Sequence, residues 1–151
     1  MAVQTVYPST QPVAVVGAKA TEIPATIISR TVADTGSIGF GIAVAQGDED
    51  KSVKLFGTGA TKFVGITMLD RSANGTSVNP DSFAEGESAR IMTIGDIWVN
   101  ASVAVVAGDP VYLVAADGKF TNVSTGNTLV PNARFDTSTT AANQLAVVRL
   151  S

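Results

Sequence analysis

The chain has 151 residues, of which 10 are basic and 13 acidic, and it contains neither cysteine nor histidine. Without those residue types there is no Ser-His-Asp relay, no cysteine nucleophile, no disulfide and no zinc site with the usual nitrogen and sulfur ligands. A net charge of -3 and a charged fraction of 15% also argue against binding to nucleic acid, whose phosphates require clustered basic side chains.

The composition favours β structure. Val, Ile and Thr together supply 46 residues, whereas Leu, Met, Glu, Gln, Lys and Arg supply 27. Branched side chains fit the pleated surface of a sheet and are mildly disfavoured in helices. We therefore expect an all-β fold, a compact sandwich, jelly-roll or barrel-like domain of about ten short strands with an extended N-terminal arm.

The arm is predicted at residues 1–12, and residues 13–151 are predicted to form a single β domain. Pro8 and Pro12 forbid a helix in the arm and favour extended backbone. We expect the arm to fasten the protein to a neighbour through Val3, Val6 and Tyr7, by adding as a strand to a sheet edge; the alternative is a free terminus. No secretory signal and no membrane span are predicted, because basic residues are missing at the start and no apolar run is long enough.

Short apolar runs separated by Gly, Asp, Asn and Pro predict the strands. In chain order these are 13–18, 25–32, 38–45, 52–56, 62–69, 88–94, 96–100, 103–106, 111–115, 119–123 and 144–150. The clearest hairpin joins 111–115 to 119–123, since Asp117-Gly118 supplies the positive φ angles of a tight turn. The polar stretch 71–80 is predicted to be a surface loop.

No catalytic, cofactor or metal site is predicted. Residues 57–62 begin like a phosphate-binding loop, but Lys62 stands where a dinucleotide-binding motif needs its third glycine, and no Gly-Lys-Ser/Thr follows. The chain continues into a strand, so these residues predict a turn. The acidic residues 48–50 have no spaced partners for calcium and predict a solvated turn. Carboxylates suited to general acid and base chemistry are recognised by their separation in space, which the sequence leaves open; the candidates are Asp81, Glu85, Glu87 and Asp96.

Two aromatic residues are candidates for a protein interface, because aromatic rings combine large contact area with a polar atom. Trp98 is predicted to pack in the core rather than in an interface. For Tyr112 the two interpretations are equally supported. A chain that is 45% hydrophobic and 15% charged also predicts a small homo-oligomer with an apolar contact surface between copies.

A series of segments, taken together, resembles a known family. It includes Gly95-Asp96-Ile97-Trp98-Val99 and Ala107-Gly108-Asp109-Pro110-Val111-Tyr112. The other members are residues 23–30, 39–44, 63–67 followed by Asp70-Arg71, 118–121, 132–135 and 145–150. In this order the segments resemble the small cement, or head decoration, proteins of tailed bacteriophages, over roughly residues 22–151.

The resemblance implies a structural protein of the virion, not an enzyme, made in the host cytoplasm. It would bind the outer surface of the capsid as a homodimer or a homotrimer and bridge neighbouring subunits of the major capsid protein. No cofactor, nucleic acid or membrane is expected as a partner. The alternative is a glycan-binding or host-surface-binding β sandwich of a phage or bacterial surface assembly. That alternative predicts exposed aromatic side chains for sugar stacking, whereas most of the nine aromatic residues lie in apolar runs.

Overall fold

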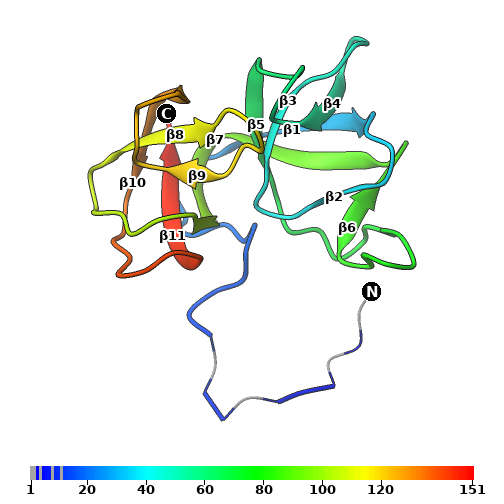
Figure 1. The fold of residues 1–151 in the computed structure, drawn as a ribbon. Helices are drawn as coiled ribbons and strands as arrows, with labels where there is room; N and C mark the ends of the chain where they lie inside the picture. Colours follow the sequence, from blue (N-terminus) through cyan, green and yellow to red (C-terminus); the bar gives the residue numbers. More distant parts are fainter. Residues whose placement is uncertain (1–2, 4, 8, 11) are drawn as a thin grey trace.

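A computed structural model describes residues 3, 5–7, 9–10 and 12–151 (Figure 1). Its described part is all-β, with eleven strands and no helix, as the sequence predicts. The strands are β1 (Thr26–Val32), β2 (Ser37–Gly39), β3 (Ala43–Gln46), β4 (Ser52–Leu55), β5 (Phe63–Thr67), β6 (Ser82–Ala84), β7 (Ser88–Ala101), β8 (Pro110–Val114), β9 (Phe120–Thr121), β10 (Asn127–Phe135) and β11 (Gln144–Leu150).

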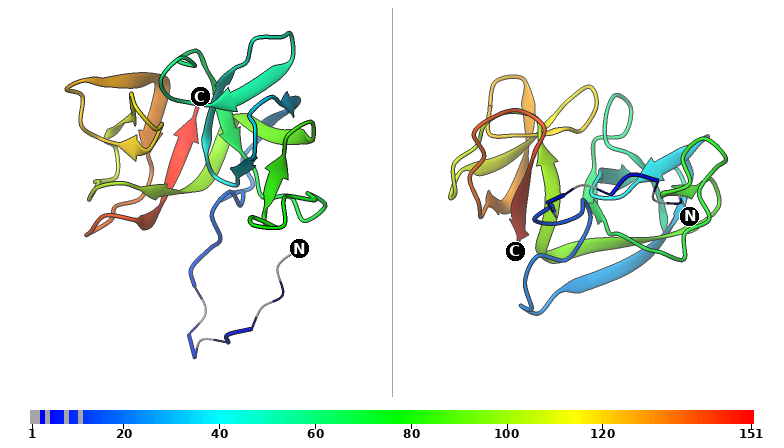
Figure 2. Two further views of the ribbon diagram at one scale, coloured as in Figure 1. Left: turned by 45° about the vertical axis from the view of Figure 1, so that its right-hand side comes forward. Right: turned by 90° about the horizontal axis from the view of Figure 1, so that it is seen from below.

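Nine of these strands form two small closed barrels that share β7. The first barrel runs β1-β4-β3-β5-β7 and closes because β1 also pairs with β7. The second runs β7-β11-β10-β8-β9 and closes because β9 also pairs with β7. Figure 2 shows the two barrels side by side. Because one strand belongs to both, neither barrel is complete without the other.

Gly95 is the point where β7 passes from one barrel to the other. The residues before it pair with β1 and β5, and the residues from Gly95 to Ala101 pair with β11. Gly95 has a φ of +134°, and a Cβ there would lie 2.9 Å from the Cβ of Ala25 and 3.0 Å from the sulfur of Met92. Only glycine fits this bend without strain. The sequence predicted two strands, 88–94 and 96–100, whereas the structure has one bent strand.

The core follows the two barrels and also fills the space between them. Ile91 belongs to the cluster inside the first barrel, with Val44, Val53 and Phe83. Its neighbour Met92 belongs to the larger cluster that fills the second barrel. Since successive strand residues face opposite sides, the outer wall of the first barrel is buried against the second.

The short sheet of β2 and β6 covers one end of the first barrel. Ile38 pairs with Phe83, and both side chains are fully buried. Phe40, just after β2, meets Phe83 edge to face, with ring centroids 5.2 Å apart and an interplanar angle of 80°. The loop 71–80 leads into β6 and contains no strand, as predicted.

Several predicted strands are wrong in detail. Residues 13–18 and 103–106 form no strand, because the first stretch turns at Gly17 and the second is a loop held by side chains. The predicted strand 38–45 is divided by a turn at Gly41, whose φ is +68°. Strands β6 and β10 were not predicted. The predicted hairpin of β8 and β9 is present, and its residues Val111, Leu113 and Phe120 are buried.

Candidate assembly surfaces

The segment after the arm is fixed to the body by main-chain hydrogen bonds. The Gly17 N–H donates to the carbonyl of Trp98 at 2.8 Å, and the Trp98 N–H donates to the carbonyl of Ala18 at 3.0 Å. The Leu69 N–H donates to the Gly17 carbonyl at 2.8 Å. Residues 17–20, which we call the anchor, therefore set the position from which the preceding chain leaves the body.

The described residues before the anchor leave the two barrels and lie below them in the view of Figure 1. The side chains of Val3, Val6, Tyr7 and Val13 are 84%, 74%, 79% and 87% exposed. No charged side chain occurs before Lys19. The three residues that the sequence predicts for partner binding, Val3, Val6 and Tyr7, thus lie on the surface as an uncharged, partly apolar segment.

Tyr112 lies on the outer face of the second barrel. Its neighbours in β8, Val111 and Leu113, point into the core, so the tyrosine points outward and is half-buried. The residue opposite it in β10 is Leu129, which is 51% exposed. Sequence reasoning missed Leu129, because β10 was not predicted.

Two further apolar side chains lie exposed beyond this strand pair, Val106 and Val123. Their segments are joined by Asp109, whose carboxylate accepts hydrogen bonds from the Val106 N–H at 2.9 Å and the Asn122 side-chain amide at 2.7 Å. The Asn122 bond, followed by the Val106 bond, lowers the pKa of Asp109. We call the surface formed by Val106, Tyr112, Val123 and Leu129 the Tyr112 face.

Trp98 lines a surface groove instead of lying within the core, so the prediction of a core tryptophan is wrong in this respect. The groove has a volume of about 380 Å³ and no titratable side chain in its lining. Its residues are Val13, Trp98, Thr137, Ser138, Thr139, Gln144 and Leu145. We call it the Trp98 groove.

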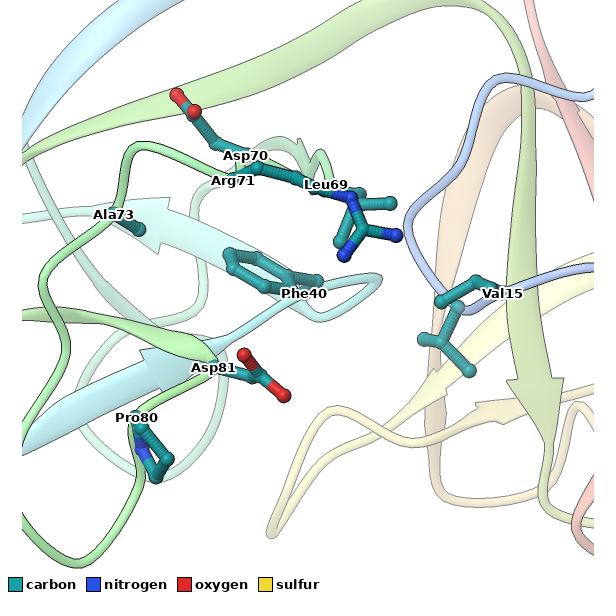
Figure 3. A pocket seen from close by; sticks show the side chains of 9 residues that line it. Val15, Phe40, Leu69, Asp70, Arg71, Ala73, Pro80 and Asp81 are labelled. Atoms are coloured by element: carbon teal, nitrogen blue, oxygen red, sulfur yellow. The ribbon is translucent and has the colours of Figure 1, made fainter. Parts of the chain in front are cut away.

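A second cavity of about 260 Å³ lies between the start of the body and the loop 71–80 (Figure 3). Phe40 and Leu69 supply apolar surface, and Arg71 and Asp81 lie on either side of the Phe40 ring. Asp70 is also at this cavity, where the hydroxyl and the N–H of Ser72 lower the pKa of its carboxyl. This cavity is charged, in contrast to the Trp98 groove.

The carboxylates considered for acid and base chemistry include two with structural partners. Asp96 is fully buried and paired with Arg149. Glu87 accepts hydrogen bonds from the N–H groups of Asn74, Gly75 and Ala84, at 2.8, 3.2 and 2.6 Å. Partial burial acts to raise the pKa of Glu87, but these hydrogen bonds outweigh it and the pKa is lowered. Glu87 therefore fixes the loop 71–80 to the body.

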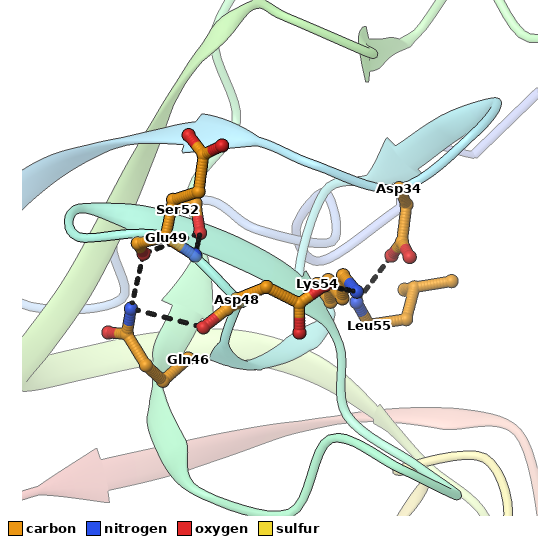
Figure 4. Close-up of polar contacts among 8 residues, drawn as sticks. Asp34, Gln46, Asp48, Glu49, Ser52, Lys54 and Leu55 are labelled. Atoms are coloured by element: carbon orange, nitrogen blue, oxygen red, sulfur yellow. Dashed lines mark hydrogen bonds and ion pairs between the residues drawn. The ribbon is translucent and has the colours of Figure 1, made fainter.

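The acidic turn is closed by its own hydrogen bonds (Figure 4). The Ser52 hydroxyl donates to the Glu49 carbonyl and accepts from the Glu49 N–H, and Lys54 pairs with Asp48. Residues 57–60 form a tight turn in which Gly57 and Ala60 exchange main-chain hydrogen bonds. Within the described part of the chain, no three metal-ligating side chains gather at one place, and no helix is long and apolar enough to cross a membrane.

Comparison with solved structures gives six matching chains, among them the following two. A chain of the structure titled "The capsid of Myoviridae Phage XM1" has a TM-score of 0.77 and 21% sequence identity, covering 100% of this chain and 98% of that one. The N base of head fiber gp8.5 of bacteriophage phi29 has a TM-score of 0.47 and 12% identity, covering 85% and 95%. The first likeness shows a shared fold. Comparison with curated protein sequences gave no match.

Comparison with family models identifies the family. The model described as "Structural cement protein (E217 gp24/Pam3 gp6)" matches residues 3–151, which is nearly the whole chain. It covers both barrels, the anchor and most of the residues before it. The resemblance found in the sequence is therefore confirmed, and the chain belongs to the family of phage structural cement proteins.

Proposed function

We propose that this structural capsid protein binds the outer surface of the phage head, spans the boundary between neighbouring subunits of the major capsid protein and stabilises the shell. Family membership supplies the association with a capsid. The observation that supports binding through the body is the Tyr112 face, in which Tyr112 and Leu129 lie side by side on adjacent strands. Contiguous exposed apolar side chains are typical of protein contact sites.

The rigidity of the surface below the Tyr112 face favours binding there. Val111, Leu113 and Val130 lie directly beneath it in the core. A partner that covers the Tyr112 face would order few additional side chains, which limits the entropic cost of binding. A small closed barrel thus presents a fixed apolar patch to the shell.

Bridging requires two attachments to the shell, and we propose that two linked copies provide them. Each copy binds through its Tyr112 face, and the arm of residues 1–12 fastens it to a neighbouring copy, with residues 13–151 acting as a single β body. Val3, Val6 and Tyr7 are its exposed contact residues. Many copies on one shell act together, so each copy needs only modest binding energy to reinforce it.

The alternative of a glycan-binding module has less support in the structure. Of the nine aromatic side chains, only Tyr7 is exposed; Phe40, Phe63, Trp98 and Tyr112 are half-buried, and the remaining four phenylalanines are buried. Sugar stacking uses the open faces of aromatic rings. The structure offers no pair of exposed rings on the body for that purpose.

Heads that lack this protein test the proposal by rebinding. We expect the purified protein to bind them at hundreds of copies and to raise the temperature at which they rupture. Leu129→Glu should lower the bound copy number at least tenfold, because it places a charge in the Tyr112 face. Leu55→Glu is the matched control, since Leu55 is also exposed but lies on β4 of the first barrel. Equal binding by both variants would exclude the Tyr112 face, and failure of the unmodified protein to bind would exclude the proposed function.

A further inference from the structure

The Trp98 groove lies directly beside the place where the arm leaves the body. Val13, which directly follows the arm, forms part of the groove wall. Four residues later the anchor begins at Gly17, which is hydrogen-bonded to Trp98 itself. Each body therefore presents an arm and a groove next to each other.

The groove is preformed by the hydrogen bonds of its own polar side chains. The hydroxyl of Thr137 accepts from the Val147 N–H at 2.9 Å, and that of Thr139 accepts from the Val105 N–H at 3.0 Å. The Ser138 hydroxyl accepts from the Ala107 N–H, and the Gln144 side-chain oxygen accepts from the Thr140 and Ala141 N–H groups. Because these hydrogen bonds already order the walls of the groove, little binding free energy is lost to ordering them when an occupant binds.

The chemistry of the groove matches the chemistry of the arm. Trp98 and Leu145 supply its apolar surface, and threonine, serine and glutamine supply the rest. The arm is built from the same kinds of residue, and it carries no charged side chain. The cavity at Arg71 and Asp81 is a poorer match, because an uncharged arm would desolvate its charged groups without pairing them.

The arm of the same chain does not occupy the groove. The side chains of Val3, Val6 and Tyr7 remain largely exposed, and in Figure 1 and the left view of Figure 2 the described residues before the anchor lie below the barrels. The groove and the apolar side chains of the arm are thus both uncovered in a single copy.

We propose that the arm of one copy lies in the Trp98 groove of a second copy and that the exchange is reciprocal. Because arm and groove adjoin at Val13, a two-fold axis beside this residue carries each arm across the groove of the other copy. Both sites are then filled by one symmetric interface, which closes and leaves no arm unpaired. Val6 and Tyr7 enter the groove against Trp98 and Leu145 of the second copy.

Sedimentation velocity of the purified protein, without phage heads, tests this exchange separately from capsid binding. The unmodified protein should be a dimer. Deletion of residues 2–12, Tyr7→Glu and Leu145→Glu should each weaken dimerisation at least tenfold, whereas Leu55→Glu should leave it unchanged. Tyr7→Glu keeps the test decisive if Leu145→Glu fails to fold, because Tyr7 lies outside the barrels.

Mixing two monomeric variants shows which copy supplies the arm. The deletion variant retains an intact groove, and the Leu145→Glu or Trp98→Ala variant retains an intact arm, so one arm and one groove remain in a mixed pair. We expect a tagged deletion variant to capture the groove variant but not a second copy of itself. A monomeric unmodified protein, an arm-independent dimer or an arm-dependent trimer would overturn the reciprocal exchange.

Discussion

Asp96 of β7 and Arg149 of β11 form a bidentate ion pair. The Arg149 Nε donates to one carboxylate oxygen of Asp96 at 2.8 Å, and a terminal guanidinium nitrogen donates to the other at 2.7 Å. The hydroxyl of Thr21 donates to the same carboxylate at 2.8 Å, and the Ala20 N–H donates to the Asp96 carbonyl. One buried residue therefore joins two strands of the second barrel to the anchor from which the arm starts.

Replacing Asp96 by Ala should destabilise the protein by about 1–3 kcal/mol, because it leaves hydrogen-bond donors of Arg149 and Thr21 unsatisfied, although Arg149 keeps its ion pair with Asp136. Chemical denaturation monitored by circular dichroism measures the loss. The control is Lys119→Ala, which removes an ion pair with Asp117 whose two side chains are both exposed. That change should cost about 0–1 kcal/mol. Equal losses of unfolding free energy in the two variants would mean that the Asp96–Arg149 pair stabilises the fold no more than an exposed ion pair does.

The same pair predicts a pH dependence of stability. Hydrogen bonds from Arg149, and then from Thr21, lower the pKa of Asp96 below its ordinary value of 3.8, although burial opposes the shift. A carboxyl whose pKa is lowered in the folded state stabilises the protein above the unfolded pKa and loses that contribution as the pH falls through the folded pKa. The difference in unfolding free energy between the unmodified protein and Asp96→Asn should therefore be constant above about pH 5 and shrink towards pH 3. A difference that is independent of pH over this range would contradict the assignment.

Gly17 and Gly86 form a matched pair for testing the anchor. Their φ angles are +83° and +82°, so alanine costs roughly 1–2 kcal/mol of backbone strain at either position. At Gly86 a Cβ meets nothing within 4 Å, whereas at Gly17 it lies 2.8 Å from the Cβ of Phe40 and 2.9 Å from the N of Leu69. Gly17→Ala should cost about 1–3 kcal/mol more than Gly86→Ala. Melting temperatures check this, and similar values for the two variants would show that the anchor is not tightly packed.

Leu113 and Leu129 are a buried and an exposed leucine on adjacent strands of the second barrel, so comparing them tests which side chains belong to the core. Leu113 is fully buried, so Leu113→Ala should cost about 2–5 kcal/mol. Leu129→Ala, on the adjacent strand, should change stability by less than about 0.5 kcal/mol, because its side chain is half exposed. Thermal unfolding of the two variants gives the comparison. A large effect at Leu129 would mean that the Tyr112 face is part of the core.

The sequence predicts those strands whose local pattern agrees with their final position. The hairpin of β8 and β9 has a turn signal between two apolar runs, and β11 is an apolar run that is buried along most of its length. Strand β10 was missed because Pro131 and Asn132 interrupt it, and Asn132 adopts a φ of +56°. The pairing of β10 with β8 shifts register between Leu129 and Arg134, and Arg134 pairs with Pro110 of β8 on one side and with Arg149 of β11 on the other. Such a register shift depends on the whole barrel and leaves no periodic signal in the sequence.

The surfaces were predictable only in part. The exposed residues of the arm follow from its prolines and from its composition. The Trp98 groove could not be predicted, because its residues come from three separate stretches of the chain that meet only after both barrels close. Leu129 was not predicted as a surface residue, because its strand β10 was not predicted. The signal that places Tyr112 outward is the alternation of β8, in which Val111 and Leu113 take the buried positions.

An image reconstruction of heads carrying the protein tests most directly whether it reinforces the capsid from outside. The proposed function predicts density of two fused barrels on the outer surface, above the boundary between neighbouring major capsid subunits, with the Tyr112 face turned towards the shell. Density on the inner surface, on the tail, or above the centre of a single capsid subunit would contradict it.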